Sequence, residues 1–227
     1  MQRKQSIIKS FSFDGLSEDD YSKESKRHLR KFLDTTKAQL FFANGVLLVE
    51  GVAEAIIIPI LAKKFLTEKI DLCKSGIELV NIGGVAFNHF GLLFNNDDEK
   101  KRLLSKCAII TDSDPEDGKE ISDRAQKAKD LEKHNLKVCL APHTLEYDLF
   151  EQSGQNKTIM RDVYRKLHPK TERLKSEFDA QTLMQSLAQN KDKAEFALQL
   201  CDRLGTEDAF DVPDYIKEAI LFVVSIE

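Results

Sequence analysis

The chain has 227 residues, of which 41% are hydrophobic, and its 34 Lys and Arg against 38 Asp and Glu residues give a formal net charge of −4. A chain of this size can bury a hydrophobic core without help from a disulfide or a structural metal. The acidic balance excludes nucleic-acid binding through a broad basic surface, because that mode of binding needs clustered cations.

The sequence predicts neither a membrane-spanning segment nor a secretory signal. The longest apolar run, at about residues 55–62, is interrupted by Pro59, whereas a membrane-spanning helix needs roughly 20 apolar residues. The N-terminal segment has no continuous apolar stretch followed by a small-residue cleavage site. The four cysteines form no C-x-x-C pair, which is typical of reduced thiols. We therefore expect a cytoplasmic protein without a membrane partner.

The first part of the chain differs in character from the remainder. Residues 1–44 are highly charged, and residues 21–40 place apolar side chains at helical spacing, which predicts a helical linker. From residue 45 onward, apolar strands are expected at 46–51, 77–84, 107–114 and 137–142, with helices at 53–65 and 120–134 and a short helix or turn at 87–94. Such alternation indicates an α/β fold with a parallel sheet flanked by helices.

The strand signal disappears after about residue 150. Helices are expected at 162–167, 175–189, 193–204 and 212–226, joined by polar segments. We therefore predict an appended helical subdomain at residues 152–227, after a linker at 1–44 and an α/β domain at 45–151.

Acidic residues follow three of the predicted strands. Glu50 comes directly after the first strand, and Glu54 lies one helical turn later. Asp112 and Asp114 end the third strand, where residues two apart point to the same side if the chain stays extended. Glu146 follows the fourth strand. Because the carboxyl ends of parallel strands meet at one edge of the sheet, we expect these side chains to converge there.

Gathered carboxylates repel one another unless a cation lies between them. Hard divalent ions such as Mg²⁺ and Mn²⁺ select oxygen-rich clusters of this kind. Each acid alone has a simpler interpretation: Glu54 suits a helix N-terminus, and Asp112 with Asp114 suits a solvated turn. Their expected convergence is what favours a metal site.

Several motifs resemble a known family. The segments LLVEGVAEAIIIPILA, VNIGGVAF with its Gly-Gly turn, AIITDSDP, APHTLEYDLF and KAEFALQL closely resemble the Toprim domain of OLD (overcoming lysogenisation defect) family endonucleases. The resemblance extends from about Gly45 to the C-terminus. It implies that residues 45–151 are a Toprim catalytic domain and that the protein is a hydrolase, a metal-dependent DNA endonuclease that uses two Mg²⁺ or Mn²⁺ ions.

The resemblance also implies roles for individual residues. By motif, Glu50, Asp112 and Lys193 correspond to catalytic residues, and Lys193 occupies the position of the active-site lysine in K-x-E-F-A, although Ala194 replaces the usual glycine after it. The expected metal ligands are Glu50, Glu54, Asp112, Asp114 and Glu146. The residues that bind DNA are not identified, and six basic residues are candidates for phosphate contacts: Lys63, Lys64, Arg161, Arg165, Lys166 and Lys170.

Family members carry an ABC-type ATPase domain before the Toprim domain, and residues 1–44 resemble its tail. No G-x-x-x-x-G-K-[ST] phosphate loop occurs in this chain. The resemblance therefore implies an ATPase domain as partner, together with DNA, a homo-oligomeric assembly and a role in defence against phage.

Other interpretations compete with a nuclease. The alternative from another class is a non-catalytic metal-binding interaction module that partners an ABC-type ATPase. Among enzymes, a topoisomerase needs a separate domain with a nucleophilic tyrosine, of which the four tyrosines give no sign. A haloacid-dehalogenase-like phosphatase has its D-x-D motif on the first strand rather than the third.

Overall fold

The computed structural model describes residues 20–32, 38–83, 87–114, 121–170, 178–207 and 209–225. Four parallel strands form one sheet in the order β2-β1-β3-β4. The strands are β1 (Gly45–Val49), β2 (Ile77–Asn81), β3 (Lys106–Asp112) and β4 (Leu136–Ala141). The four expected strands and the α/β fold class are confirmed.

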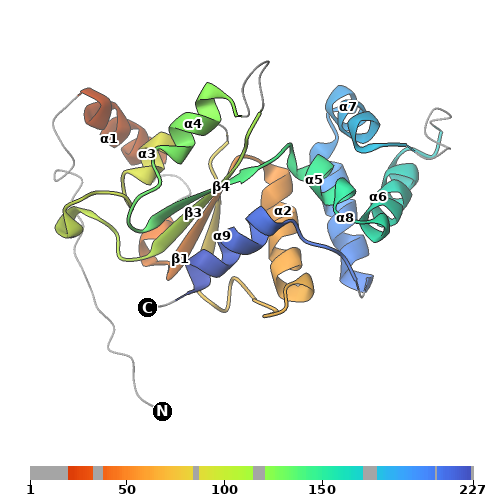
Figure 1. Cartoon of the computed structure of the whole chain (residues 1–227), viewed down its shortest axis with the longest axis horizontal. Coiled ribbons are helices and arrows are strands. Elements are labelled where there is room, and N and C mark those ends of the chain that lie inside the picture. Colours follow the sequence, from red (N-terminus) through yellow and green to blue (C-terminus); the bar gives the residue numbers. More distant parts are fainter. Residues whose placement is uncertain are drawn as a thin grey trace, which may run out of the picture.

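Helices cover both faces of the sheet. The helices α1 (Asp20–Phe32), α3 (Phe87–Gly91) and α4 (Asp123–Lys129) lie on one face, and α2 (Val52–Ile60) and α9 (Asp214–Val224) lie on the other (Figure 1). Side chains alternate between the faces along each strand. In β1, Leu47 packs into the core beneath α2 and α9, whereas Leu48 packs into the core beneath α1 and α3. Burial on both faces explains why the central strand β1 is a continuous apolar run.

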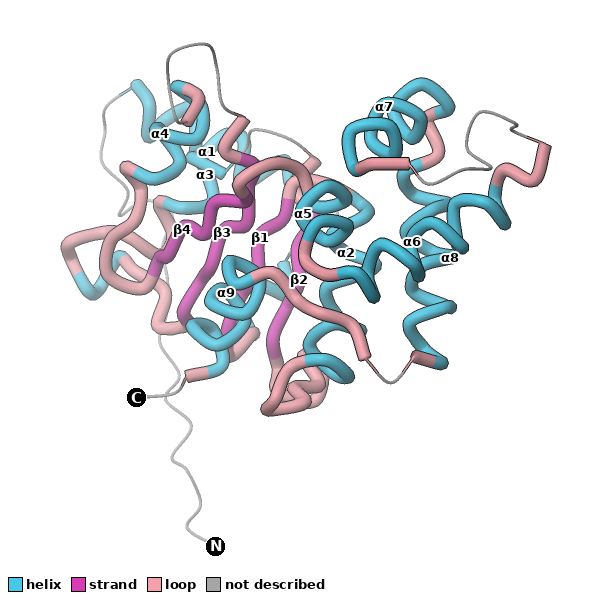
Figure 2. The backbone as a smooth tube through the Cα atoms, turned by 45° about the vertical axis from the view of Figure 1, so that its right-hand side comes forward, coloured by secondary structure: helices cyan, strands magenta, loops and turns pink. Residues whose placement is uncertain are grey.

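Four helices follow β4 and lie largely beyond one edge of the sheet (Figure 2). They are α5 (Leu145–Glu151), α6 (Gly154–Leu167), α7 (Ala180–Asn190) and α8 (Lys193–Thr206). The last helix, α9, then returns to pack against β1, β3 and β4, so the segment expected to be a helical subdomain also contributes to the core of the sheet. The boundaries at 44 and 151 stay a prediction. Among the described helices, none is long and apolar enough to cross a membrane.

Shorter elements complete the described chain. They are η3 (Ala38–Phe42), η4 (Leu61–Phe65) and η5 (Glu99–Lys101). The segment expected as one helix at 53–65 is α2 followed by the π-helical turn η4. Pro59 lies near the end of α2 and cannot donate a backbone hydrogen bond, which favours such a change of helical geometry.

Lys64 fixes the end of α8 relative to α2. Its ammonium donates hydrogen bonds to the carbonyls of Leu204, Gly205 and Glu207 at 2.9, 2.8 and 2.8 Å. The C-terminal carbonyls of a helix have no intrahelical partner, so a cation there is favoured. Because the C-terminal ends of α2 and α8 meet at Lys64, the two helices run in parallel and their N-termini lie toward the same edge of the sheet.

We expect Lys64→Met to lower the free energy of unfolding by about 1–3 kcal/mol, because hydrogen bonds from a charged group are lost and the carbonyls are left unpaired. Urea denaturation measures this change. Lys63→Met is the matched control, since Lys63 is 64% exposed and pairs only with Asp71 among the described interactions, and surface pairs contribute about 0–1 kcal/mol. Equal effects of the two substitutions would contradict this role for Lys64.

Candidate functional site

Glu50 and Glu54 lie where β1 passes into α2. Glu50 follows the last residue of the buried strand, and Gly51 is the extended N-cap of α2. A Cβ atom at Gly51 would lie 2.9 Å from the Oε2 atom of Glu54, so glycine leaves room for this carboxylate to fold back over the helix N-terminus. Burial raises the pKa of Glu54, and the charges of Glu146 and Glu50 act in the same direction.

Asp112 is the last residue of β3, and the extended conformation does not continue as far as Asp114. Ser113 donates its backbone N–H to the carbonyl of Ala141 at 2.9 Å and its hydroxyl to the carbonyl of Pro142 at 2.7 Å. Asp114 then adopts a left-handed conformation with φ of 42°, which Asp tolerates better than most residues. The extended conformation assumed from the sequence therefore ends at Asp112, and strand alternation does not set the direction of Asp114.

Glu146 and Lys193 come from the helical part of the chain. Glu146 lies in the first turn of α5, where only 4% of its side chain is exposed, and Lys193 is the first residue of α8. The Nζ atom of Lys193 donates to the Oε2 atom of Glu146 at 3.3 Å. Lys193 is 44% exposed, so this ion pair has a buried carboxylate and an ammonium open to solvent.

Asp112 is the residue on which the charges of the other acidic residues act. Burial raises the pKa of Asp112 from 3.8 to about 8, and four nearby carboxylates act in the same direction. These neighbours are Glu50, Glu54, Asp114 and Glu146. The acids of the three strand ends therefore lie within electrostatic reach of one another. Lys193 joins them because its charge acts on Glu54 and because it pairs with Glu146.

Arg124 on α4 is a residue of this site that the sequence did not indicate. Its Nη2 atom lies 2.6 Å from Asp114 Oδ2 and 3.1 Å from Glu50 Oε1, and its Nη1 atom lies 3.3 Å from Glu50 Oε2. Thr111 also donates its hydroxyl to Glu50. Arg124 is one of many charged residues on a solvent-exposed helix, and no spacing in the sequence distinguishes it.

The residues present fit a hard divalent cation by their chemistry. Within the described ranges, no three His, Cys, Asp or Glu side chains already form a metal-binding group. The cluster nevertheless consists of carboxylate oxygens, the donors that Mg²⁺ and Mn²⁺ prefer. Two buried hydroxyls at this edge, those of Thr144 and Tyr215, also have no hydrogen-bond partner in the described structure. The ligand assignments of the five acids stay a prediction.

The basic residues considered for phosphate contacts are mostly engaged elsewhere. Lys64 binds the end of α8, and Arg161 donates to the carbonyl of Phe178 at 2.7 and 3.0 Å. Beside the acidic site, a cavity of about 270 Å³ is lined by residues that include Thr111, Arg124 and Lys127. Cationic side chains therefore border the carboxylates on the α4 side as well as at Lys193.

The raised pKa of Asp112 predicts a pH-dependent stability. In the folded protein this carboxyl binds its proton up to about pH 8, whereas in the unfolded chain it releases it near pH 3.9. The contribution of the protonated Asp112 carboxyl to the free energy of unfolding is therefore complete below about pH 4 and is lost as pH rises through about 8. The free energy of unfolding falls by at most about 1.4 kcal/mol per pH unit over this range. Without divalent ions, we expect the wild type to lose unfolding free energy between pH 5 and pH 8.

Urea denaturation of the wild type and Asp112→Asn across this range measures the contribution. The difference between the two proteins isolates Asp112, because burial also raises the pKa of Glu54 and Asp148. We expect the slope to be smaller in Asp112→Asn. Parallel stability curves for the two proteins would contradict the proposed burial of charge at Asp112.

The chain was compared with models of known protein families and with curated proteins. Residues 41–114 match the family described as overcoming lysogenization defect protein-like, TOPRIM domain. No curated protein matches the chain.

Solved structures extend the likeness beyond that domain. One is the C-terminal region of the OLD protein of Xanthomonas campestris pv. campestris, in a structure phased with platinum. It is 24% identical in sequence and superimposes with a TM-score of 0.58, and the match covers 82% of this chain and 94% of the Xanthomonas chain. The structure of the same region phased with iodine is 25% identical, with a TM-score of 0.57 over 81% and 95%.

The C-terminal region of the Burkholderia pseudomallei OLD protein is 20% identical, with a TM-score of 0.63 over 81% of this chain and 98% of that chain. The expected resemblance is thereby confirmed over both the α/β and the helical parts. Residues 41–114 therefore match the OLD-like Toprim domain, and the chain has the fold of the C-terminal region of OLD proteins.

Proposed function

We propose that the chain is a DNA endonuclease that hydrolyses phosphodiester bonds with two divalent ions, Mg²⁺ or Mn²⁺. The observation that carries this proposal is the gathering of four carboxylates around Asp112, whose pKa they raise together with burial. Such an excess of negative charge at the end of a parallel sheet suits a site for divalent cations rather than a structural turn. The OLD-like Toprim domain supports the same interpretation.

The proposed ligands are Glu50, Glu54, Asp112, Asp114 and Glu146. When bound, paired divalent ions supply an activated water and stabilise the leaving oxygen. The ions also supply the positive charge that a chain of net charge −4 lacks for binding a polyanion. DNA is the substrate that the family suggests, and an ABC-type ATPase domain and a second copy of the chain are its proposed partners.

Lys193 has a separate role in this proposal. Its ammonium is 44% exposed at the edge of the cluster and is held by the buried carboxylate of Glu146. The Lys193 ammonium is therefore oriented by Glu146, while almost half of the side chain stays open to solvent. A cation held in place stabilises charge that grows on the phosphoryl oxygens during hydrolysis.

Arg124 contributes positive charge on the opposite side of the cluster. Its guanidinium binds Glu50 through two nitrogens and Asp114 through one. Arginine presents a rigid set of donors that suits carboxylate and phosphate groups alike. We propose that Arg124 positions Glu50 and Asp114 and, beside the cavity that it lines, approaches the phosphate backbone.

Nicking of supercoiled plasmid DNA tests the proposal. We expect the purified chain to produce open-circular and linear DNA with Mg²⁺ or Mn²⁺ and none with EDTA. Plasmid that stays intact while the protein binds the ions would overturn the nuclease and favour a non-catalytic metal-binding module.

A further inference from the structure

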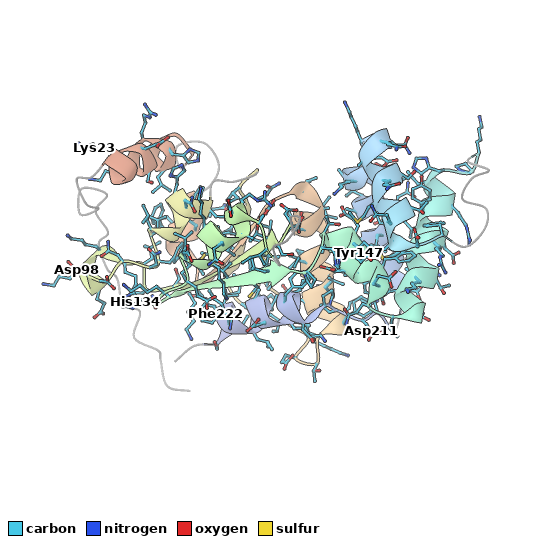
Figure 3. The ribbon with its side chains drawn as sticks, turned by 45° about the horizontal axis from the view of Figure 1, so that its top comes forward. Lys23, Asp98, His134, Tyr147, Asp211 and Phe222 are labelled. Carbon is cyan, nitrogen blue, oxygen red and sulfur yellow. The ribbon has the colours of Figure 1, made fainter. Side chains whose placement is uncertain are left out.

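Tyr215 is a buried residue close enough to the acidic site to interact with it electrostatically, although it is distant from most of the acids in sequence. It lies in the first turn of α9, the helix that packs against β1, β3 and β4, and it is 8% exposed. Figure 3 shows α9, with the labelled Phe222, running alongside the sheet, and Tyr215 belongs to the hydrophobic core that α9 shares with the sheet. Aliphatic or phenylalanine side chains satisfy such a position equally well, so packing alone does not account for the hydroxyl group.

The Tyr215 hydroxyl is buried and has no hydrogen-bond partner in the described structure. A buried hydroxyl without a partner is unfavourable, and tyrosine hydroxyls are usually paired when buried. Four carboxylates act electrostatically on this group: Asp148, Asp112, Glu54 and Glu146. Three of them are proposed metal ligands. The hydroxyl is therefore a buried donor within electrostatic reach of carboxylate acceptors, none of which lies in hydrogen-bonding position in the described structure.

We propose that Tyr215 is a positioning residue for the ion site, whose hydroxyl donates a hydrogen bond to one of these ligand carboxylates, or to a water held by them, when a divalent cation is bound. This inference rests on the proposed function, because it requires the cluster to bind an ion. A carboxylate can use one oxygen for a cation and still accept a hydrogen bond on its other lone pairs. Groups that hydrogen-bond to metal ligands fix their orientation and raise the affinity for the metal.

Thr144 provides a parallel observation at the same edge. It precedes α5 as its N-cap, yet its hydroxyl makes no capping hydrogen bond and is likewise buried without a partner in the described structure. Glu146 lies two residues later. Thr144 is thus a second buried hydroxyl without a partner, two residues before a proposed metal ligand, which agrees with donors whose partners come with a bound ligand.

Tyr215→Phe, made in the full chain, tests the proposal, with Tyr164→Phe as the matched control. Tyr164 is also buried, at 1% exposure, but its hydroxyl pairs with Ser186 on α7. We expect Tyr215→Phe to bind Mn²⁺ about 10- to 100-fold more weakly, as measured from the signal of free Mn²⁺ in electron paramagnetic resonance. Tyr164→Phe keeps the wild-type affinity.

Two further readouts separate positioning from a structural role. The chain has four tyrosines and no tryptophan, so its intrinsic fluorescence reports on tyrosine. We expect Mg²⁺ to change this fluorescence in the wild type and in Tyr164→Phe, with a smaller change in Tyr215→Phe. The thermal midpoint of ion-free Tyr215→Phe stays equal to that of the wild type or rises, because the substitution removes an unpaired buried hydroxyl.

Wild-type Mn²⁺ affinity in Tyr215→Phe, together with an undiminished fluorescence change, would overturn the role of Tyr215 and leave the proposed nuclease intact. A wild type that binds neither Mn²⁺ nor Mg²⁺ would overturn the ion site itself and this inference with it. A lower ion-free thermal midpoint with unchanged affinity would reduce Tyr215 to a packing residue.

Discussion

Replacing Asp112 by Asn is expected to abolish DNA cleavage. The amide keeps the size of the side chain but cannot ionise, so it removes the carboxylate oxygen proposed to bind the ion. We expect the rate of plasmid nicking to fall by more than about 100-fold, a larger loss than is typical for residues that only support metal ligands. Affinity for Mn²⁺ should fall in parallel, because Asp112 is proposed to hold the ion directly.

Asp97→Asn is a matched control for this substitution. Asp97 is 75% exposed and pairs with Lys133 and His134, away from the acidic site. We expect its nicking rate to equal that of the wild type. The two Asn variants also differ in stability at pH 8, because only Asp112→Asn relieves repulsion among buried carboxylates. Undiminished cleavage by Asp112→Asn would exclude Asp112 from the catalytic site.

Replacing Lys193 by Ala is expected to slow cleavage without weakening ion binding. Loss of an oriented cation beside the reacting phosphate lowers the rate by about 100- to 1000-fold, as the loss of one fixed donor does in other enzymes. Ion affinity is expected to stay the same or rise, because the ammonium that binds Glu146 competes with a divalent cation for the same charge. Single-turnover cleavage and Mn²⁺ titration measure the two quantities separately.

Lys217→Ala controls for the general loss of positive charge. Lys217 is 41% exposed, close to the 44% of Lys193, and forms a surface ion pair with Asp214. We expect wild-type cleavage from this variant. If Lys193→Ala lost rate and ion affinity to the same degree, Lys193 would act by maintaining Glu146 rather than by stabilising the phosphate.

The sequence predicted the parts of the fold that depend on local pattern. Apolar runs identify the four strands, because a parallel sheet covered on both faces buries most strand residues, and all of them in the central strand β1. Glu50 and Asp112 stood out because each lies at the end of such a run. Glu146 joins them because it follows the fourth strand. A role for Lys193 comes only from the family resemblance, since a lysine at a helix N-terminus has no distinctive local signal.

Other features depend on tertiary packing and left no trace in the sequence. Arg124 contacts Glu50 across 74 residues, and nothing in a charged helix marks one arginine for such a contact. Tyr215 belongs to the apolar stripe of α9, so the sequence pattern predicts a core residue and gives no sign of a role for its hydroxyl. Asp114 adopts a left-handed conformation two residues after Asp112, which strand alternation does not predict.

The proposed nuclease depends most directly on where divalent cations bind. Anomalous scattering from a crystal soaked with Mn²⁺ at pH 8, where the Asp112 carboxyl releases its proton more readily than at lower pH, locates the ions without reference to activity. We expect Mn²⁺ peaks in contact with Asp112 and with Glu50 or Glu146. Fully occupied Mn²⁺ elsewhere, with none at this edge of the sheet, would contradict the proposed metal site.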